Sequence, residues 1–184
     1  YVLVPREAEI VKRGFAERGL LFRESRVGGY VVLDHVRPEF EPGPELDLTA
    51  VEVSAPFRQD WARFLIDRDI GTRWGSGTPQ RPGMTLGFRF PQPVTVSEIE
   101  LMYGFFKTDA PRDLVIEGGD SSGNSCQLFD SAGARLWEEL GARWPIFIKP
   151  IEVSELKLVQ LGKDPVFDWS LSELKLYFAV QQEN

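Results

Sequence analysis

Two carboxylates and a hydroxyl stand close together in the segment DRDIGT, at Asp67, Asp69 and Thr72. Carboxylate and hydroxyl oxygens at this spacing can converge, with backbone carbonyls of the same turn, on a hard cation such as Ca²⁺. The same aspartates can instead accept hydrogen bonds from their own backbone in Asx turns. Arg68 lies between them, and its positive charge would compete with a metal ion. Both a cation site and a purely structural turn remain open.

A second set of residues combines aromatic rings with polar groups, as sugar recognition requires. A sugar offers its C–H face to an aromatic plane and its paired hydroxyls to forked donors or acceptors. The runs YGFFK, at 103–107, and DPVFDWS, at 164–170, hold such groups. The predicted ligand-contacting residues are Trp61, Phe105, Phe106, Lys107, Arg112, Phe167, Asp168 and Trp169, with Gln59 and Asp109 as further polar candidates. The alternative is that several of these rings pack against the N-terminal segment.

Catalytic chemistry has little support in the sequence. The single histidine, His35, sits in the strand-like run YVVLDHV, and the single cysteine, Cys126, cannot form an intrachain disulfide. The adjacent acids Glu138 and Glu139 would not face each other on one helix, so they make a poor acid–base pair. We therefore expect a chain that is not an enzyme.

Charge and length restrict the partners. The formal net charge of −7 repels phosphate backbones, which excludes nucleic acid as a partner. No apolar run is long enough to span a membrane. The chain begins with Tyr1 and not with Met, so we expect an excised piece of a larger membrane or secreted protein.

The first 37 residues predict a short α/β segment. YVLV at 1–4 is typical of a strand, REAEIVKRGFAER at 6–18 has helical spacing of apolar residues, and two strand-like runs follow around the Gly28-Gly29 pair. This segment is too small to cover both faces of a sheet, so it is expected to pack on something else. Residues 38–47 are rich in proline and acid and predict a linker.

From residue 48 to 184 the texture changes to short apolar runs separated by turns. In EIELMY, Ile99 and Leu101 alternate with Glu98 and Glu100, and the same period of two recurs in ELKLYF at 173–178. Several runs of this kind predict half-buried antiparallel strands. The fold class is therefore mostly β, an antiparallel jelly-roll β-sandwich behind a short N-terminal α/β segment.

Three patches in order resemble the discoidin or coagulation-factor type C family of galactose-binding-like domains. They are FLIDRDIGTRWGSGTPQRPGMTLGFRFPQPVTVSEIELMYG, then DAPRDLVIEGGDSSGNSCQLF, then ELKLVQLGKDPVFDWSLSELKLY. The resemblance covers roughly residues 48 to 180. The version seen here looks most like the C-terminal module of bacterial membrane proteins that resemble glycosyltransferases acting on lipid-linked sugars.

The resemblance carries its own expectations. It implies a structural Ca²⁺ held by Asp67, Asp69 and Thr72, with Glu173 on the last strand closing the shell. The family's middle glycine in the aspartate turn is replaced here by Arg68. It implies that Trp74 plugs one end of the sandwich and that Arg73 pairs with a nearby carboxylate.

Two functions follow, both outside the cytoplasm. The first is a non-catalytic module that binds carbohydrate or a cell-envelope polymer on behalf of its parent protein. The second is a structural or protein-interaction module that packs on that parent and takes no small ligand.

Overall fold

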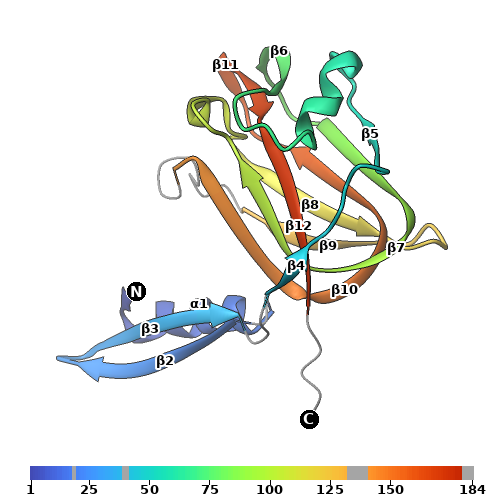
Figure 1. Ribbon diagram of the computed structural model, residues 1–184. Helices are drawn as coiled ribbons and strands as arrows, with labels where there is room; N and C mark the ends of the chain where they lie inside the picture. The colour runs from blue at the N-terminus through green and yellow to red at the C-terminus, as the bar shows by residue number, and fades with distance from the viewer. Residues whose placement is uncertain (18–19, 39–41, 132–140, 180–184) are drawn as a thin grey trace.

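In the computed structural model, the described residues are 1–17, 20–38, 42–131 and 141–179. Within these ranges the chain forms a small N-terminal unit and a larger all-β body (Figure 1). None of the helices in these ranges has the length and apolar character that a transmembrane span requires.

The N-terminal unit has the strand, helix, strand, strand order that the sequence predicts. Its elements are β1 (Val2–Leu3), α1 (Pro5–Glu17), β2 (Leu20–Val27) and β3 (Tyr30–Pro38). The three strands form an antiparallel sheet in the order β1-β3-β2. Gly28 and Gly29 both have positive φ, of 56° and 89°, and make the turn between β2 and β3.

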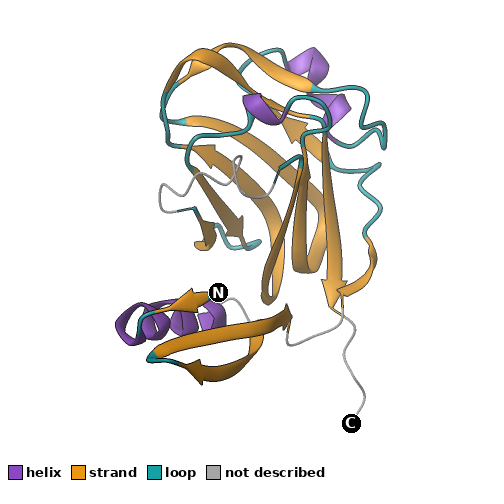
Figure 2. Cartoon of the chain, turned by 90° about the vertical axis from the view of Figure 1, so that its left-hand side faces the viewer, coloured by secondary structure: helices purple, strands orange, loops and turns teal. Residues whose placement is uncertain are grey.

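This unit has a core of its own. Helix α1 covers one face of the small sheet (Figure 2). Ala8 and Phe15 on the helix and Val31 and Leu33 on β3 are buried together, and they form a cluster separate from the core of the sandwich. The segment therefore buries the helix-facing side of its sheet without help from the larger body. The expectation that it packs on something else through its other face stays a prediction.

The segment expected to be a linker holds a strand. Residues Pro42–Glu45 form β4, which pairs with the last strand of the sandwich, so that Tyr177 faces Glu45. The backbone N–H of Leu46 continues the contact by donating to the carbonyl of Leu176 at 2.8 Å. Prolines are tolerated here because β4 lies at the edge of its sheet.

The larger body is an antiparallel β-sandwich, which confirms the predicted fold class. Its main sheet runs β4-β12-β7-β10-β8-β9, with β5 on another part of β7, and β6 pairs with β11 in a separate two-stranded sheet. The elements are β5 (Glu52–Ser54), η1 (Gln59–Leu65), β6 (Trp74–Gln80), β7 (Met84–Met102), η2 (Lys107–Asp109), β8 (Leu114–Gly119), β9 (Ser125–Asp130), β10 (Arg143–Gln160), β11 (Asp164–Leu171) and β12 (Glu173–Ala179). The long strands β7 and β10 curve together around the core (Figure 1).

The alternation read from the sequence places the core correctly. Ile99 and Leu101 are fully buried in the main cluster. Glu98 and Glu100, expected on a solvent-facing side, are also buried. Glu100 pairs with the Arg143 side chain and accepts a hydrogen bond from the Tyr177 hydroxyl at 2.9 Å. The outer face of this sheet therefore carries a buried carboxylate with its own partners, which alternation alone does not reveal.

Candidate functional site

One end of the sandwich gathers η1, η2, β6, β11 and the loops beside them (Figure 1). We call this end the loop surface and define it as residues 56–65, 75–83, 103–113 and 161–170. Strand β6 is at its centre. It pairs with β11 and contacts η1, and β11 in turn contacts η2. Every predicted ligand-contacting residue lies in these ranges.

A buried glutamine fixes the loops of this surface to one another. The Gln80 side-chain amide donates to the carbonyls of Ala110 and Asp168, both at 3.0 Å. Its oxygen accepts from the backbone N–H of Arg112 at 3.0 Å and from the Gln160 amide at 2.9 Å. A fully satisfied buried polar network of this kind holds its neighbours in one arrangement. Sequence reasoning missed Gln80, since a single polar residue at a strand end gives no signal of burial.

Arg112 and Phe167, predicted as ligand contacts, are brought together. The Arg112 guanidinium lies 5.4 Å from the centre of the Phe167 ring. Its Nε donates to the Asp164 carboxylate at 2.7 Å, and its terminal nitrogens donate to the carbonyls of Ala110 and Thr108 at 3.0 and 2.8 Å. Asp164 was not predicted. The arginine is thus held rigidly beside a ring that is 39% exposed.

Phe106 belongs to a parallel arrangement next to it. The Arg73 guanidinium lies over the Phe106 ring, with its carbon 3.9 Å from the ring centre. Arg73 also pairs with the Asp109 carboxylate, and its Nη1 lies 3.2 Å from the Ser170 hydroxyl. The expectation that Arg73 pairs with a nearby carboxylate is confirmed.

Phe105 and Lys107 flank Phe106 and both point outward. Phe105 is 92% exposed, and Lys107 is exposed as well. Gly104, with a φ of 53°, lets this loop lie on the turn before β6, because a Cβ there would come within 2.9 Å of the Ile70 carbonyl oxygen. The aspartate turn therefore supports the loop that presents Phe105.

Trp61 lies on η1, which contacts β6, and Asp168 lies on β11, which pairs with β6. The Trp61 ring is 37% exposed and is covered on one side by the Arg58 guanidinium at 4.3 Å. The Asp168 carboxylate accepts a hydrogen bond from the backbone N–H of Gly77 at 3.1 Å. Gln59 serves the backbone instead of the surface, since its amide group bonds the N–H of Ala55 and the carbonyl of Val53, each at 2.7 Å.

Trp169 is the prediction that the structure corrects. Its ring is 1% exposed and packs edge-on against Trp74, with 5.3 Å between ring centres. A ring enclosed in this way cannot stack on a sugar from solution, so Trp169 is a core residue. Trp74 is fully buried, as expected, and its indole N–H donates to the Phe57 carbonyl at 2.8 Å.

Most carboxylate oxygens of the aspartate turn accept hydrogen bonds from groups within the same turn. The two carboxylate oxygens of Asp67 accept from the backbone N–H of Asp69 at 3.0 Å and from the Thr72 hydroxyl at 2.8 Å. Asp69 in turn accepts from the N–H of Gly71 at 2.8 Å. These are the Asx-turn bonds that the sequence left as an alternative to a cation site.

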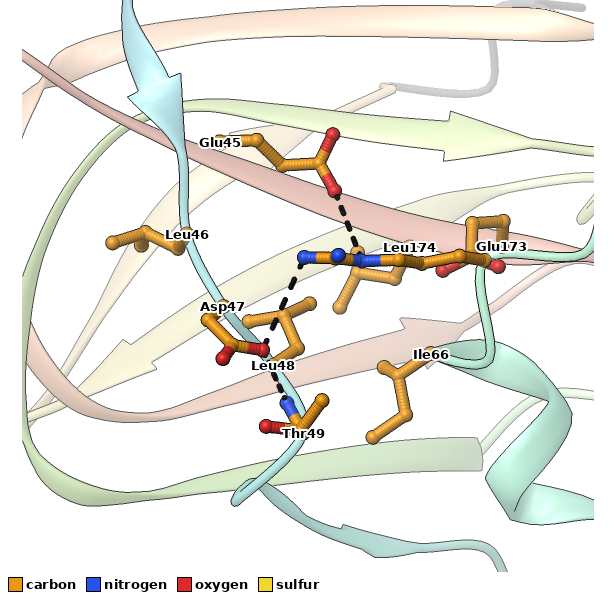
Figure 3. Close-up of a pocket in the computed structure, with 9 residues that line it drawn as sticks. Glu45, Leu46, Asp47, Leu48, Thr49, Ile66, Glu173 and Leu174 are labelled. Carbon is orange, nitrogen blue, oxygen red and sulfur yellow. Dashed lines mark hydrogen bonds and ion pairs between the residues drawn. The ribbon is translucent and has the colours of Figure 1, made fainter.

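Arg68 adopts the left-handed backbone conformation in the middle of this turn, with a φ of 64°. This is a conformation that glycine takes readily and other residues take at a cost. The Arg68 side chain lies near two acids, at 3.8 Å from Glu45 at the end of β4 and 4.0 Å from Asp47 just after it. These acids line a small cavity together with Glu173 (Figure 3). A positive charge therefore stands beside the place where a cation would have to bind.

Glu173 is the exception in this region, because it has an unsatisfied oxygen. The side chain is buried, and its Oε2 has no hydrogen-bond partner among the residues that the structure describes. Burial raises the pKa of Glu173 to about 7, against the lowering effect of a hydrogen bond from the Arg68 backbone, and the charge of Asp67 raises it further.

The fit to calcium is incomplete. Calcium takes six to eight oxygen ligands. Among the described residues, no group of three or more His, Cys, Asp or Glu side chains gathers closely enough to hold an ion. Asp67, Asp69 and Thr72 lie close together, but both carboxylate oxygens of Asp67 accept hydrogen bonds from the other two residues. The positive charge next to this turn is that of Arg68. Calcium remains a prediction from the family resemblance, and no property of the site is derived through it.

Comparison with known structures identifies the fold. The family 32 carbohydrate-binding module of NanJ from Clostridium perfringens, solved with galactose, aligns with a TM-score of 0.57 and 16% identity, over 72% of this chain and 97% of that one. CpGH89CBM32-5 from the same organism, solved with GalNAc-β-1,3-galactose, gives 0.60 and 16% over 74% and 100%. A chitosan-binding module from a Paenibacillus sp. IK-5 chitosanase/glucanase gives 0.59 and 16% over 72% and 97%.

The sandwich therefore has the discoidin-like fold of family 32 carbohydrate-binding modules, as the sequence resemblance implied. Neither a scan against protein-family models nor a search of the curated proteins finds a match.

Proposed function

We propose that this chain is a non-catalytic module that binds carbohydrate through its loop surface. The observation that carries the proposal is the pair of Phe167 and Arg112. A partly exposed ring lies beside a guanidinium that Asp164 and two carbonyls hold in place. Such a pair supplies a stacking plane with a positive charge fixed at its side, without the cost of ordering the arginine on binding.

The fold supports the same function. The neighbours named above were solved with galactose or with a galactose-containing disaccharide, or are described as chitosan-binding. We extend carbohydrate binding to this chain as the accessory role of a larger protein that acts outside the cytoplasm. That parent protein resembles a membrane glycosyltransferase only through the sequence likeness described above.

Calorimetric titration with galactose, N-acetylgalactosamine and chitosan oligosaccharides tests the proposal. A single small site predicts dissociation constants between about 1 mM and 1 μM. Phe167→Ala and Arg112→Ala should each weaken binding by about tenfold or more, because the first removes the stacking plane and the second removes the charge that is held beside it. Arg89→Ala, on the exposed outer side of β7, is the matched control and should bind as the wild type does. If the Phe167 and Arg112 variants bound these sugars as tightly as the wild type does, this site would be rejected.

The alternative function, protein interaction, has one specific observation in its favour. Val2, Val27 and Tyr30 are all more than half exposed on the strands of the N-terminal unit. Val27 and Tyr30 are cross-strand partners. Exposed apolar side chains gathered on one sheet are typical of a contact surface. Failure of every glycan to bind would leave this second function as the better account of the chain.

A further inference from the structure

Arginine side chains stacked on aromatic rings recur across the loop surface. Besides Arg73 on Phe106 and Arg112 on Phe167, the Arg58 guanidinium lies 4.3 Å from the Trp61 ring centre. Arg81 lies 5.4 Å from the ring of Phe57. The chain as a whole carries a net charge of −7, so the charge of these clustered guanidinium groups is opposite in sign to the net charge of the chain.

These cations fall into two groups. Arg73 and Arg112 are neutralised locally, by Asp109 and Asp164. Arg58, Arg81 and Lys107 have no side-chain hydrogen bond or ion pair with any residue in the described part of the chain, and all three are exposed. We call these three residues the cationic rim.

Strand β6 holds the rim next to the proposed sugar site. A Cβ on Gly77 would lie 2.8 Å from the Arg58 guanidinium, and the N–H of the same glycine donates to Asp168. Arg81 directly follows Gln80, whose side chain binds the backbone N–H of Arg112. Lys107 directly precedes Thr108, whose carbonyl accepts from the Arg112 guanidinium.

The backbone and side chain of Arg58 are both held in a defined conformation. Its backbone is in the left-handed region, with a φ of 49°, which a non-glycine residue adopts at a cost. Trp61 holds the plane of its guanidinium from one side. A stacked guanidinium without an internal ion pair still has its forked donors to offer to an oxyanion.

The balance of donors and acceptors narrows the ligand further. A neutral sugar hydroxyl both donates and accepts, so sites for neutral sugars need protein carboxylates as acceptors. Here Asp109 and Asp164 are already bound to arginines, and one oxygen of Asp168 accepts from a backbone N–H. Asp60 is an exposed acid of the loop surface, whereas Arg63 and Lys163 are exposed cations in addition to the rim. The exposed basic side chains of this surface therefore outnumber its exposed acids, which favours a ligand rich in acceptors.

We propose that the loop surface recognises glycans that carry carboxylate groups, such as uronic acid polymers, through Arg58, Arg81 and Lys107. This inference rests on the proposed carbohydrate-binding function and specifies its ligand class. The ring of Phe167 then takes the C–H face of one residue, while the rim takes the carboxylates of that residue and its neighbours.

The experiment compares oligosaccharides of one length that differ in charge. Alginate and polygalacturonate oligosaccharides are the carboxylated probes, and β-1,4-galactan oligosaccharides are the neutral probe, each titrated calorimetrically at 25 and 250 mM NaCl. We expect the carboxylated probes to bind at least tenfold more tightly at low salt and to lose most of that advantage at high salt, because the added salt screens charges at the surface.

Substitutions in the rim identify the groups responsible. Arg58→Ala and Lys107→Ala should each weaken binding of the carboxylated probes about three- to tenfold and leave galactan binding unchanged. Arg89→Ala controls for the loss of any surface charge. Circular dichroism melts verify folding, and Lys107→Ala keeps the test decisive if Arg58→Ala does not fold, because the Lys107 side chain is exposed and makes no hydrogen bond or ion pair with the described residues.

Three outcomes decide the matter. Carboxylate preference that depends on the rim supports the inference. Galactan binding as tight as alginate binding, or rim variants without effect, overturns the inference and leaves the proposed function standing. Failure of both probe classes and of the neutral sugars named above overturns both.

Discussion

The sandwich and the N-terminal unit each bury a hydrophobic core against a β-sheet, but the two cores differ in size. Both pack apolar residues from a sheet, but the sandwich encloses three tryptophans completely, Trp74, Trp144 and Trp169. Among the N-terminal residues whose burial is described, the enclosed cluster consists of Ala8, Phe15, Val31 and Leu33. Because burial of apolar area is the main favourable term in folding, a large core tolerates constraints that a small one cannot. The sandwich can therefore hold arginines, a glutamine network and a buried glutamate at its periphery.

The largest expected effect breaks the sandwich and spares its neighbour. Trp74→Ala removes a fully buried ring that contacts Trp169, and should lower the free energy of unfolding of the sandwich by about 3–5 kcal/mol. Hydrogen exchange of separate segments, measured at increasing denaturant concentrations, gives the free energy of unfolding of each region. The loop surface should lose protection together with the core strands.

The matched change is Phe15→Ala in the N-terminal unit. Phe15 packs against Tyr1 and Phe22, and its loss should unfold residues 1–38 while the sandwich keeps its protection. If Phe15→Ala also lowered protection in β7 and β10, the two cores would not be independent, and the comparison drawn above would fail.

How much the sequence revealed also differs between the two regions. The N-terminal elements were predicted nearly to their ends, because helix and hairpin signals are local. In the sandwich, alternation placed Ile99 and Leu101 in the core, but it could not show that Glu100 is buried by Arg143 and Tyr177, which lie far away in the chain.

The candidate site shows the same limit. Aromatic and polar composition singled out Phe167 and Arg112 as candidates, and the structure brings these two side chains together. Their contact with a ligand stays a prediction. Composition was not enough to separate Phe167 from Trp169, two residues apart, because strand β11 passes between them from an exposed stretch into a buried one. Gln80 and Asp164 act only through tertiary hydrogen bonds, so a single sequence contains no sign of their roles.

A smaller effect of pH sharpens the comparison. Burial raises the pKa of Glu173 to about 7 from an ordinary value of 4.5, so the folded state holds its proton more tightly than the unfolded state does. This group's contribution to stability is complete below pH 4.5, and it is lost as pH rises to about 7.

Glu173→Gln should remove that loss. Relative to the wild type, the variant should gain stability between pH 5 and 8, and the gain should appear in the sandwich transition and not in residues 1–38. Thermal melts at a series of pH values, with Glu117→Gln on β8 as a control, measure the difference. A wild-type curve parallel to that of the variant would contradict the raised pKa.

The smallest expected effect concerns calcium. With Arg68 in the aspartate turn, 1 mM CaCl₂ should shift the melting temperature of the wild type little. Arg68→Gly removes the competing charge and suits the positive φ at this position, so the variant should show a larger calcium-dependent shift that a chelator reverses. A strong calcium response in the wild type would instead favour the metal site that the family resemblance implies.

Strand β4 gives the chain a mechanical property. It joins the N-terminal unit to the sandwich and is held at the sheet edge by its pairing with β12. Two of its four residues are prolines, which have no N–H to contribute to that pairing. A pull applied from the N-terminal side would load this short clasp before it reached β7 or β10. Residues 42–45 would separate from β12 first and lengthen the connection, while the loop surface stayed folded.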